Sequence, residues 1–150
     1  MSVVLTYFSD FPLGWNVMYQ KLQDQVQTRA DLLLAGRFDD LAPEYLFPMP
    51  VYVNDQMIPL RCPAEGINRA AALRDLLQRR QVDMLKITVK AVELPRAGRF
   101  RVYADWHALS QTAKQSQLWQ LTYYMRDTAQ GVRSEMLHYH SPVCLGCDVP

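Results

Sequence analysis

Four long runs of alternating apolar and polar residues dominate the second half of this chain. They cover residues 84–94, 99–109, 116–126 and 132–141, and turn-forming or polar segments separate them. Each run has about ten residues, whereas strands most often have about five or six. Long strands joined by short loops predict an antiparallel meander that curls around something.

Two amphipathic helices are predicted ahead of these strands. From Gly14 to Ala35 apolar residues recur at steps of three and four, with polar residues between them. This spacing is typical of a helix with one face on a core. Residues 38–42 predict one more short helical turn, stopped at Pro43, and residues 64–80 predict the second long helix.

A short β-hairpin is predicted between the helices. Residues 46–60 are rich in β-branched and aromatic side chains around a turn at Asn54 and Asp55. Its three prolines cannot donate hydrogen bonds to a ladder, so the hairpin belongs at a sheet edge. The whole pattern predicts an α+β class and one domain over residues 1–150, with a core at about 14–142 and a tail at 143–150.

Composition excludes several classes of function. The net charge is +1 with both signs interspersed, whereas a nucleic-acid-binding surface needs clustered cations. No segment reaches the roughly 18–20 apolar residues of a membrane span, and the N-terminus does not resemble a signal peptide. Three cysteines fit a reducing compartment, so we expect a cytoplasmic protein. No glycine-rich phosphate loop occurs, and no cofactor is expected.

Three local stretches resemble parts of a known superfamily. Residues 33–41 (LLAGRFDDL) resemble the exit from its first helix, and residues 63–67 (PAEGI) resemble the start of its helix before the sheet. Residues 136–142 (MLHYHSP) resemble its final strand. The chain therefore resembles the nuclear transport factor 2-like (SnoaL-like) superfamily over roughly residues 14–142.

The resemblance implies a cone-like, curved antiparallel sheet wrapped around N-terminal helices, also called a cystatin-like roll. It implies an apolar cavity between sheet and helices, and a dimer through the outer sheet face. Members include ketosteroid isomerases, scytalone dehydratase, polyketide cyclases and catalytically silent binding or assembly domains, so the fold alone does not decide function. No Asp here matches the general base of the isomerases.

Strand alternation assigns the side chains to two faces of the sheet. On two central strands the inward residues are Phe100, Val102, Ala104, Trp106, Trp119, Leu121, Tyr123 and Met125. On the last strand we place Val132, Ser134, Met136 and His138 inward, and Leu137 and Tyr139 outward. A β-bulge in this strand would reverse the last assignment, because it shifts every later side chain to the other face.

The inward residues predict a small-molecule site. Its candidate ligand-binding residues are Trp15, Trp106, Trp119, Tyr123 and Met136, because apolar walls with a few polar groups are typical of such sites. The alternative is that these large residues only fill the core. His138 is the candidate acid–base group, with Tyr123 as a hydrogen-bond donor.

Two functions follow from these candidates. The first is a small-molecule-binding or assembly domain with an apolar pocket between sheet and helices. The second is a SnoaL-like isomerase, dehydratase or cyclase that acts on a small apolar substrate. The lack of an inward carboxylate favours binding, because proton abstraction beside a carbonyl in this fold usually needs one.

Two further expectations concern the outer face and the tail. The outer face carries aromatic surface that predicts a two-fold homodimer, through Tyr103, His107, Thr122, Tyr124, Leu137 and Tyr139. The C-terminal segment carries four residues of the types that bind zinc: His138, His140, Cys144 and Cys147. Their spacing is not a usual finger pattern, and a frayed tail with free thiols is the alternative.

Overall fold

A computed structural model describes residues 4–5, 13–111 and 117–140, with side chains from Asn16 onward. The elements in chain order are β1 (Val4–Leu5), α1 (Leu13–Ala35), α2 (Phe38–Leu41), the 3-10 turn η1 (Ala42–Glu44), β2 (Met49–Val53), β3 (Gln56–Leu60), α3 (Pro63–Arg79), β4 (Met84–Glu93), β5 (Arg99–Leu109), β6 (Gln117–Thr128) and β7 (Gly131–His140). The predicted helices and long strands are confirmed to within two residues at each end. No described helix combines the length and apolarity needed to cross a membrane.

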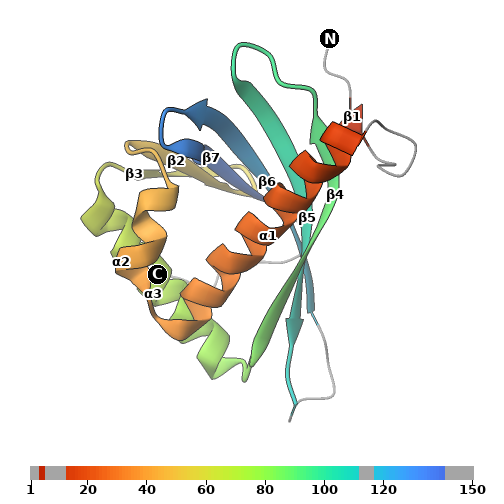
Figure 1. Ribbon diagram of the computed structural model, residues 1–150. Helices are drawn as coiled ribbons and strands as arrows, with labels where there is room; N and C mark the ends of the chain where they lie inside the picture. The colour runs from red at the N-terminus through yellow and green to blue at the C-terminus, as the bar shows by residue number, and fades with distance from the viewer. Residues whose placement is uncertain (1–3, 6–12, 112–116, 141–150) are drawn as a thin grey trace.

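The strands form one curved sheet in the order β1-β4-β5-β6-β7-β2-β3. Figure 1 shows the helices on one side of this sheet, with α1 running diagonally across it. The meander β4–β7 is antiparallel as predicted, but β2 pairs with β7 in parallel, so the sheet is mixed. The hairpin turns at Asn54 and places β3 at the edge of the sheet, as its prolines predicted.

Local chemistry explains where α1 ends. Gly36 follows the helix with a φ of +73°, a conformation that glycine adopts without steric cost. Its N–H donates to the carbonyl of Leu33 at 3.1 Å, and the N–H of Arg37 donates to the carbonyl of Leu32 at 3.0 Å. These bonds satisfy carbonyls that the helix end would otherwise leave free.

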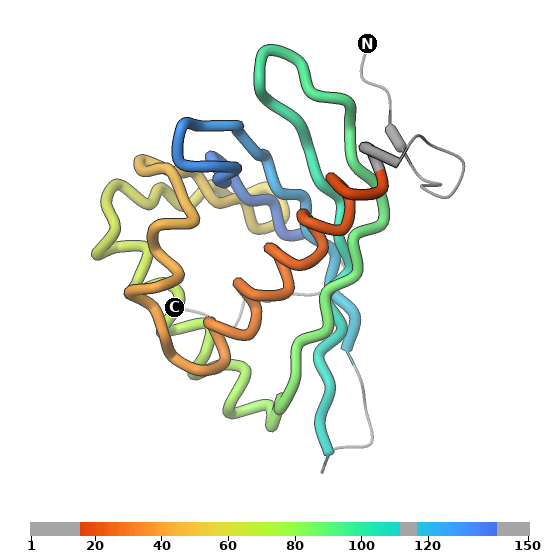
Figure 2. The backbone as a smooth tube through the Cα atoms, viewed as in Figure 1, coloured from red at the N-terminus to blue at the C-terminus, as the bar shows by residue number. Residues whose placement is uncertain are grey.

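Two glutamines of α1 seal the open edge of β4. The short β1 pairs only with the last two residues of that strand. Along the rest of the edge, the Gln27 amide donates to the carbonyl of Leu85 and accepts from the N–H of Ile87, at 2.8 and 2.9 Å. The Gln23 amide does the same one step further on, with Ile87 and Val89. This side-chain ladder fixes α1 along β4, where the backbone trace in Figure 2 places it.

The inner face of the sheet forms the core together with the helices. All eight residues predicted to face inward on β5 and β6 are buried, which confirms the alternation on these strands. They pack against apolar residues of α1 and α3 such as Val26, Leu33 and Leu77.

The predicted register of β7 is wrong. Tyr124 of β6 pairs with Met136, but the next residue of β6, Met125, pairs with Ser134, so Glu135 is an extra residue in a β-bulge. Beyond the bulge, Leu137 and Tyr139 face inward, while Met136 and His138 lie on the outer face. Leu137 is accordingly only 6% exposed. The bulge shifts each later side chain to the other face.

Two hydrogen bonds from segments outside the meander fix Ser134, the residue next to the bulged Glu135. The guanidinium of Arg29 in α1 donates to the hydroxyl of Ser134 at 2.6 Å. The N–H of Leu46, just before β2, donates to the carbonyl of Ser134 at 2.8 Å. Ser134 is fully buried between these partners, so residues about 90 and 105 positions away in the sequence help to fix the register of the last strand.

Candidate functional site

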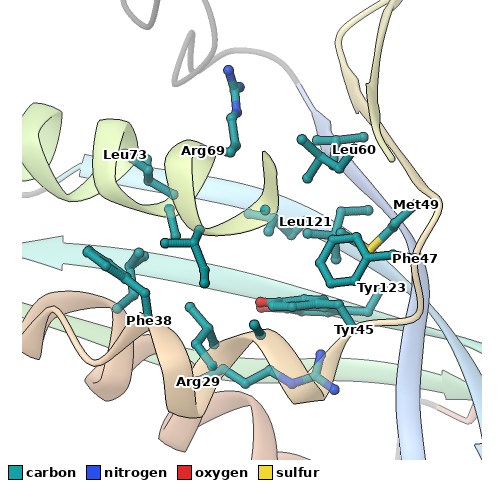
Figure 3. A pocket seen from close by; sticks show the side chains of 18 of the residues that line it. Arg29, Phe38, Tyr45, Phe47, Met49, Leu60, Arg69, Leu73, Leu121 and Tyr123 are labelled. Atoms are coloured by element: carbon teal, nitrogen blue, oxygen red, sulfur yellow. The ribbon is translucent and has the colours of Figure 1, made fainter. Parts of the chain in front are cut away.

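A partly open pocket lies between the inner face of the sheet and the three helices (Figure 3). Aliphatic side chains of α1, α2, α3, β2 and β6 form most of its walls, including Leu33, Leu41, Leu73, Val51 and Leu121. Aromatic rings complete them: Phe38, Tyr45, Phe47, Trp106, Tyr123 and Tyr139.

Space in the pocket is small. The centre of a water-sized molecule can reach about 60 Å³ of it. A single water needs at least about 10–15 Å³ by such a measure, and an apolar cavity of about 150 Å³ can hold benzene. The pocket therefore has room for a few waters or for a compact group of a few heavy atoms, unless the side chains at its mouth move.

Tyr123 carries the best-defined polar group of the pocket. The indole N–H of Trp106 donates to the Tyr123 hydroxyl oxygen at 2.7 Å, and both side chains are buried. Because an indole only donates, the Tyr123 oxygen is the acceptor of this bond and its own proton is free to be donated elsewhere. No described residue accepts that proton, so it is available for a hydrogen bond within the pocket.

Two further phenols border the same space. The hydroxyls of Tyr45 and Tyr139 make no hydrogen bond to any residue that the structure describes. Burial raises the pKa of Tyr123, Tyr139 and Tyr45 above the ordinary value of 10. All three groups therefore keep their protons at neutral pH and act as donors.

Arg29 is a buried cation beside these phenols, and it is only 2% exposed. Besides Ser134, its guanidinium contacts Glu44, with 3.2 Å to the carbonyl and 3.5 Å to the carboxylate. It lies over the ring of Tyr45 at 5.2 Å and that of Tyr123 at 5.9 Å, distances at which a cation is attracted to an aromatic ring. Arg29 therefore holds α1, η1, β6 and β7 together at the polar end of the pocket.

Comparison with known proteins identifies the fold. No protein-family model matches the chain, and no curated protein resembles it in sequence. Solved structures do match. A nuclear transport factor 2-like protein of unknown function from Shewanella oneidensis aligns with 81% of this chain and 98% of its own, at 14% identity and a TM-score of 0.63. The fold is nuclear transport factor 2-like.

Two other structures with this fold extend the comparison. A domain of unknown function with a cystatin-like fold from Nostoc punctiforme covers 84% of this chain and 78% of its own, at 11% identity and a TM-score of 0.65. A hypothetical protein from Catenulispora acidiphila with a ketosteroid isomerase-like fold, in complex with trimethylamine, covers 77% and 83%, at 7% identity and a TM-score of 0.52. At these identities the likeness concerns the fold alone.

The nuclear transport factor 2-like fold brings together only some of the predicted site residues. Trp106 and Tyr123 border the pocket as predicted. Trp119 is buried at 1% exposure but does not border the pocket, and its indole nitrogen has no partner within the described part. Met136 and His138 lie on the outer face because of the bulge in β7. The side chain of Trp15 lies outside the described residues.

Arg29, Tyr45 and Tyr139 were not predicted as site residues, and for Arg29 a signal existed. It occupies the position between Val26 and Leu33 on the apolar stripe of α1, where a charged residue demands a buried partner. Tyr139 was assigned to the wrong face with the rest of β7. Nothing in the sequence around Tyr45 indicated that it would reach the pocket.

His138 and His140 form a pair on the outer face, with ring centroids 4.0 Å apart. The Nε2 atom of His138 lies 3.2 Å from the carbonyl of Asn54 and therefore donates to it, and that of His140 lies 2.7 Å from the Thr122 hydroxyl. Within the described residues no group of three metal-ligating side chains occurs. Cys144 and Cys147 lie outside those residues, so the zinc site stays a prediction.

Proposed function

We propose that this chain is a small-molecule-binding domain whose ligand occupies the pocket between sheet and helices. The observation that carries the proposal is the combination of an apolar, partly open space with the unshared Tyr123 proton. Proteins seldom leave a buried donor without an acceptor, since each such group costs about 1–3 kcal/mol. A ligand or ordered water that accepts this proton removes the cost.

Binding is favoured here over catalysis. Isomerases, dehydratases and cyclases of this fold move protons, which requires a group that titrates near neutral pH. His138 faces away from the pocket, and no imidazole or carboxylate occurs among the described side chains that border it. The raised pKa values of the phenols suit them to donate hydrogen bonds and not to abstract protons.

An amine ligand, like the trimethylamine bound by the Catenulispora protein, is the second candidate. The aromatic rings of the pocket favour it, because a cation is attracted to their faces. Arg29, whose buried charge lies beside the pocket, repels a cation. We therefore place a neutral or anionic ligand ahead of an amine.

Xenon is a direct probe of the apolar space, since dry cavities bind it without any polar contact. Under xenon pressure, we expect shifts in the methyl NMR signals of Leu73, Leu121 and Leu137, which border the pocket. Ala70→Phe, on the pocket side of α3, should abolish these shifts, whereas Ala64→Phe, on the exposed start of the same helix, should not. Unchanged methyl signals in the native chain would contradict the proposal.

We also propose a homodimer through the outer face of the sheet. A groove of about 550 Å³ lies there, bordered by Tyr103, Tyr124 and His140 and by the charged pair Lys90 and Asp105. Both signs of charge in one groove suit a two-fold contact, in which the same patch meets itself. Because of the bulge, Leu137 and Tyr139 do not belong to this face.

Sedimentation velocity at micromolar concentration tests the dimer. The native chain should sediment as a dimer, and Tyr103→Glu should sediment as a monomer. Met57→Glu, a change at an exposed position of the edge strand β3, should remain dimeric. A monomeric native chain would contradict this part of the proposal.

We propose the cytoplasm as the compartment of this protein. The odd number of cysteines supports the assignment, and Cys62 is exposed and unpaired.

A further inference from the structure

The polar side chains that border the pocket share one property. Tyr45, Tyr123 and Tyr139 are phenols that keep their protons, and Arg29 and Arg69 are guanidinium groups, which only donate. No carboxylate, amide or imidazole occurs among the described lining side chains. A ligand that enters this pocket therefore finds several donors for an accepting oxygen. For an N–H group, the described lining side chains offer only the phenol oxygens as good acceptors, and that of Tyr123 already accepts from Trp106.

The positive charges of Arg29 and Arg69 also favour an anionic ligand. Arg29 is balanced only in part, since the Glu44 carboxylate lies 3.5 Å away and its side chain is 26% exposed. Arg69 forms no ion pair with any described residue, and Figure 3 shows its side chain extended away from the other labelled residues. The charge of Arg69 lowers the pKa of Tyr139 against the larger effect of burial, so its electrostatic influence reaches this phenol. An anion gains from both cations.

Size limits the rest of the ligand. The space of about 60 Å³ takes a compact alkyl group, for which Leu41, Leu73 and Leu121 provide an aliphatic wall. An apolar cavity known to hold benzene is more than twice as large, at about 150 Å³, so the alkyl group of the ligand is smaller than a benzene ring. Larger aromatic or steroid-like ligands therefore do not fit without displacement of the surrounding side chains.

We infer that the ligand is a short-chain monocarboxylate, bound with its carboxylate at the phenol hydroxyls and its alkyl group against the aliphatic wall. This inference rests on the proposed function and names the class of ligand. Hydrogen bonds to an ionised oxygen are roughly twice as strong as neutral ones, and a carboxylate has lone pairs for all three phenols. The nearby guanidinium groups offset the cost of bringing the charge out of water.

Three molecules of nearly the same shape test the inference: isobutyrate, 3-methyl-2-butanone and isobutylamine. Each is titrated into the full chain while NMR follows the indole N–H signal of Trp106, which reports on the Tyr123 hydroxyl. We expect isobutyrate to bind about tenfold or more tightly than the ketone, as a charged hydrogen bond implies, and the amine to bind most weakly. A ketone that binds as well as isobutyrate, or an amine that binds better, would overturn the inference.

Variants assign the effect to the pocket. Tyr123→Phe should weaken isobutyrate binding by about 10- to 100-fold, whereas Tyr103→Phe, on the outer face, should leave it unchanged. Arg69→Met should weaken isobutyrate several-fold without affecting the ketone, and Arg79→Met, an exposed arginine of the same helix, should change neither. Because Arg69 is not part of the core, its variant keeps the test valid if Tyr123→Phe is unstable.

Xenon separates the two possible failures. If xenon shifts the pocket methyls but isobutyrate has no preference, the proposed function stands and the carboxylate is wrong. If xenon shifts nothing, the pocket itself is closed and both proposals fail.

Discussion

The two faces of the sheet differ in how their polar groups are satisfied. On the inner face, Arg29 and Ser134 are almost completely buried and hydrogen-bonded to protein, and the Tyr123 proton has no acceptor among the described residues. On the outer face, polar side chains such as His138 and Lys90 are partly or largely exposed and have water as an alternative partner. The comparison teaches that a large side chain buried on the inner face must find its polar partners within the protein or the pocket, whereas most polar side chains of the outer face can also bond to water.

Adjacent residues of β7 provide the strongest test of this comparison. Leu137 is 6% exposed on the inner face, and His138 lies on the outer face. Leu137→Ala should lower the free energy of unfolding by about 2–5 kcal/mol, because it removes buried methyl groups and leaves a cavity. His138→Ala should lower it by about 1 kcal/mol, for one partly exposed hydrogen bond. Urea unfolding measures both, and the reverse order would show that the register is wrong.

The second-largest difference in stability is expected between substitutions of two cations, Arg29 on the inner face and Lys90 on the outer face. Arg29→Met keeps the aliphatic part of the side chain but leaves Ser134 and Glu44 without their donor, so we expect a loss of about 2–3 kcal/mol. Lys90, 60% exposed at the side chain, lies 4.0 Å from Asp105 on the outer face. Lys90→Ala should change stability by about 0.5 kcal/mol or less, since exposed pairs contribute little. Equal effects in urea unfolding would remove the distinction between the faces.

Lowering the pH from 7 to 5 should weaken the contribution of the outer face to stability before that of the inner face. Burial and the neighbouring His138 lower the pKa of His140 below its usual 6.5. The unfolded chain therefore binds more protons than the folded one, so this contribution to stability is complete above pH 6.5 and is lost as the pH falls toward the folded pKa. His140→Gln should flatten the dependence of the melting temperature on pH between 7 and 5, and Tyr123→Phe should not. An unchanged slope in His140→Gln would contradict the assignment.

The smallest effect is expected at the chain end that follows the outer-face histidines. Truncation after Val143 removes Cys144 and Cys147 and should shift the melting temperature by only about one or two degrees, as a surface change of roughly 0.5 kcal/mol does. Elemental analysis of the untagged protein provides the second measurement. Stoichiometric zinc that is lost on truncation would support the metal site formed by His138, His140 and the two cysteines.

Much of the fold was predictable because its signals are local. The step of three and four residues in α1 and the alternation in β5 and β6 each reflect one element with one buried face. The turn at Asn54 and the glycine after α1 are backbone requirements that single residues reveal. Trp106 and Tyr123 were therefore placed correctly in the pocket from the sequence alone.

The remaining features depend on contacts between distant segments. The bulge at Glu135 involves no unusual residue, and its neighbour Ser134 is held by Arg29 and by the backbone before β2. The same contacts turned His138 away from the pocket and brought Tyr139 into it.

The sequence by itself determined the order of the elements and the faces of the central strands, including the inward position of Tyr123, since periodicity depends on neighbours along one strand or helix. The tertiary structure decided the face of each residue beyond the bulge, and it gathered Arg29, Tyr45 and Tyr139 around the pocket. The physical reason is that one extra residue in a strand costs little locally but reverses every later side chain. The contacts of β7 with Arg29 of α1, with Leu46 and with β2 select between the two registers.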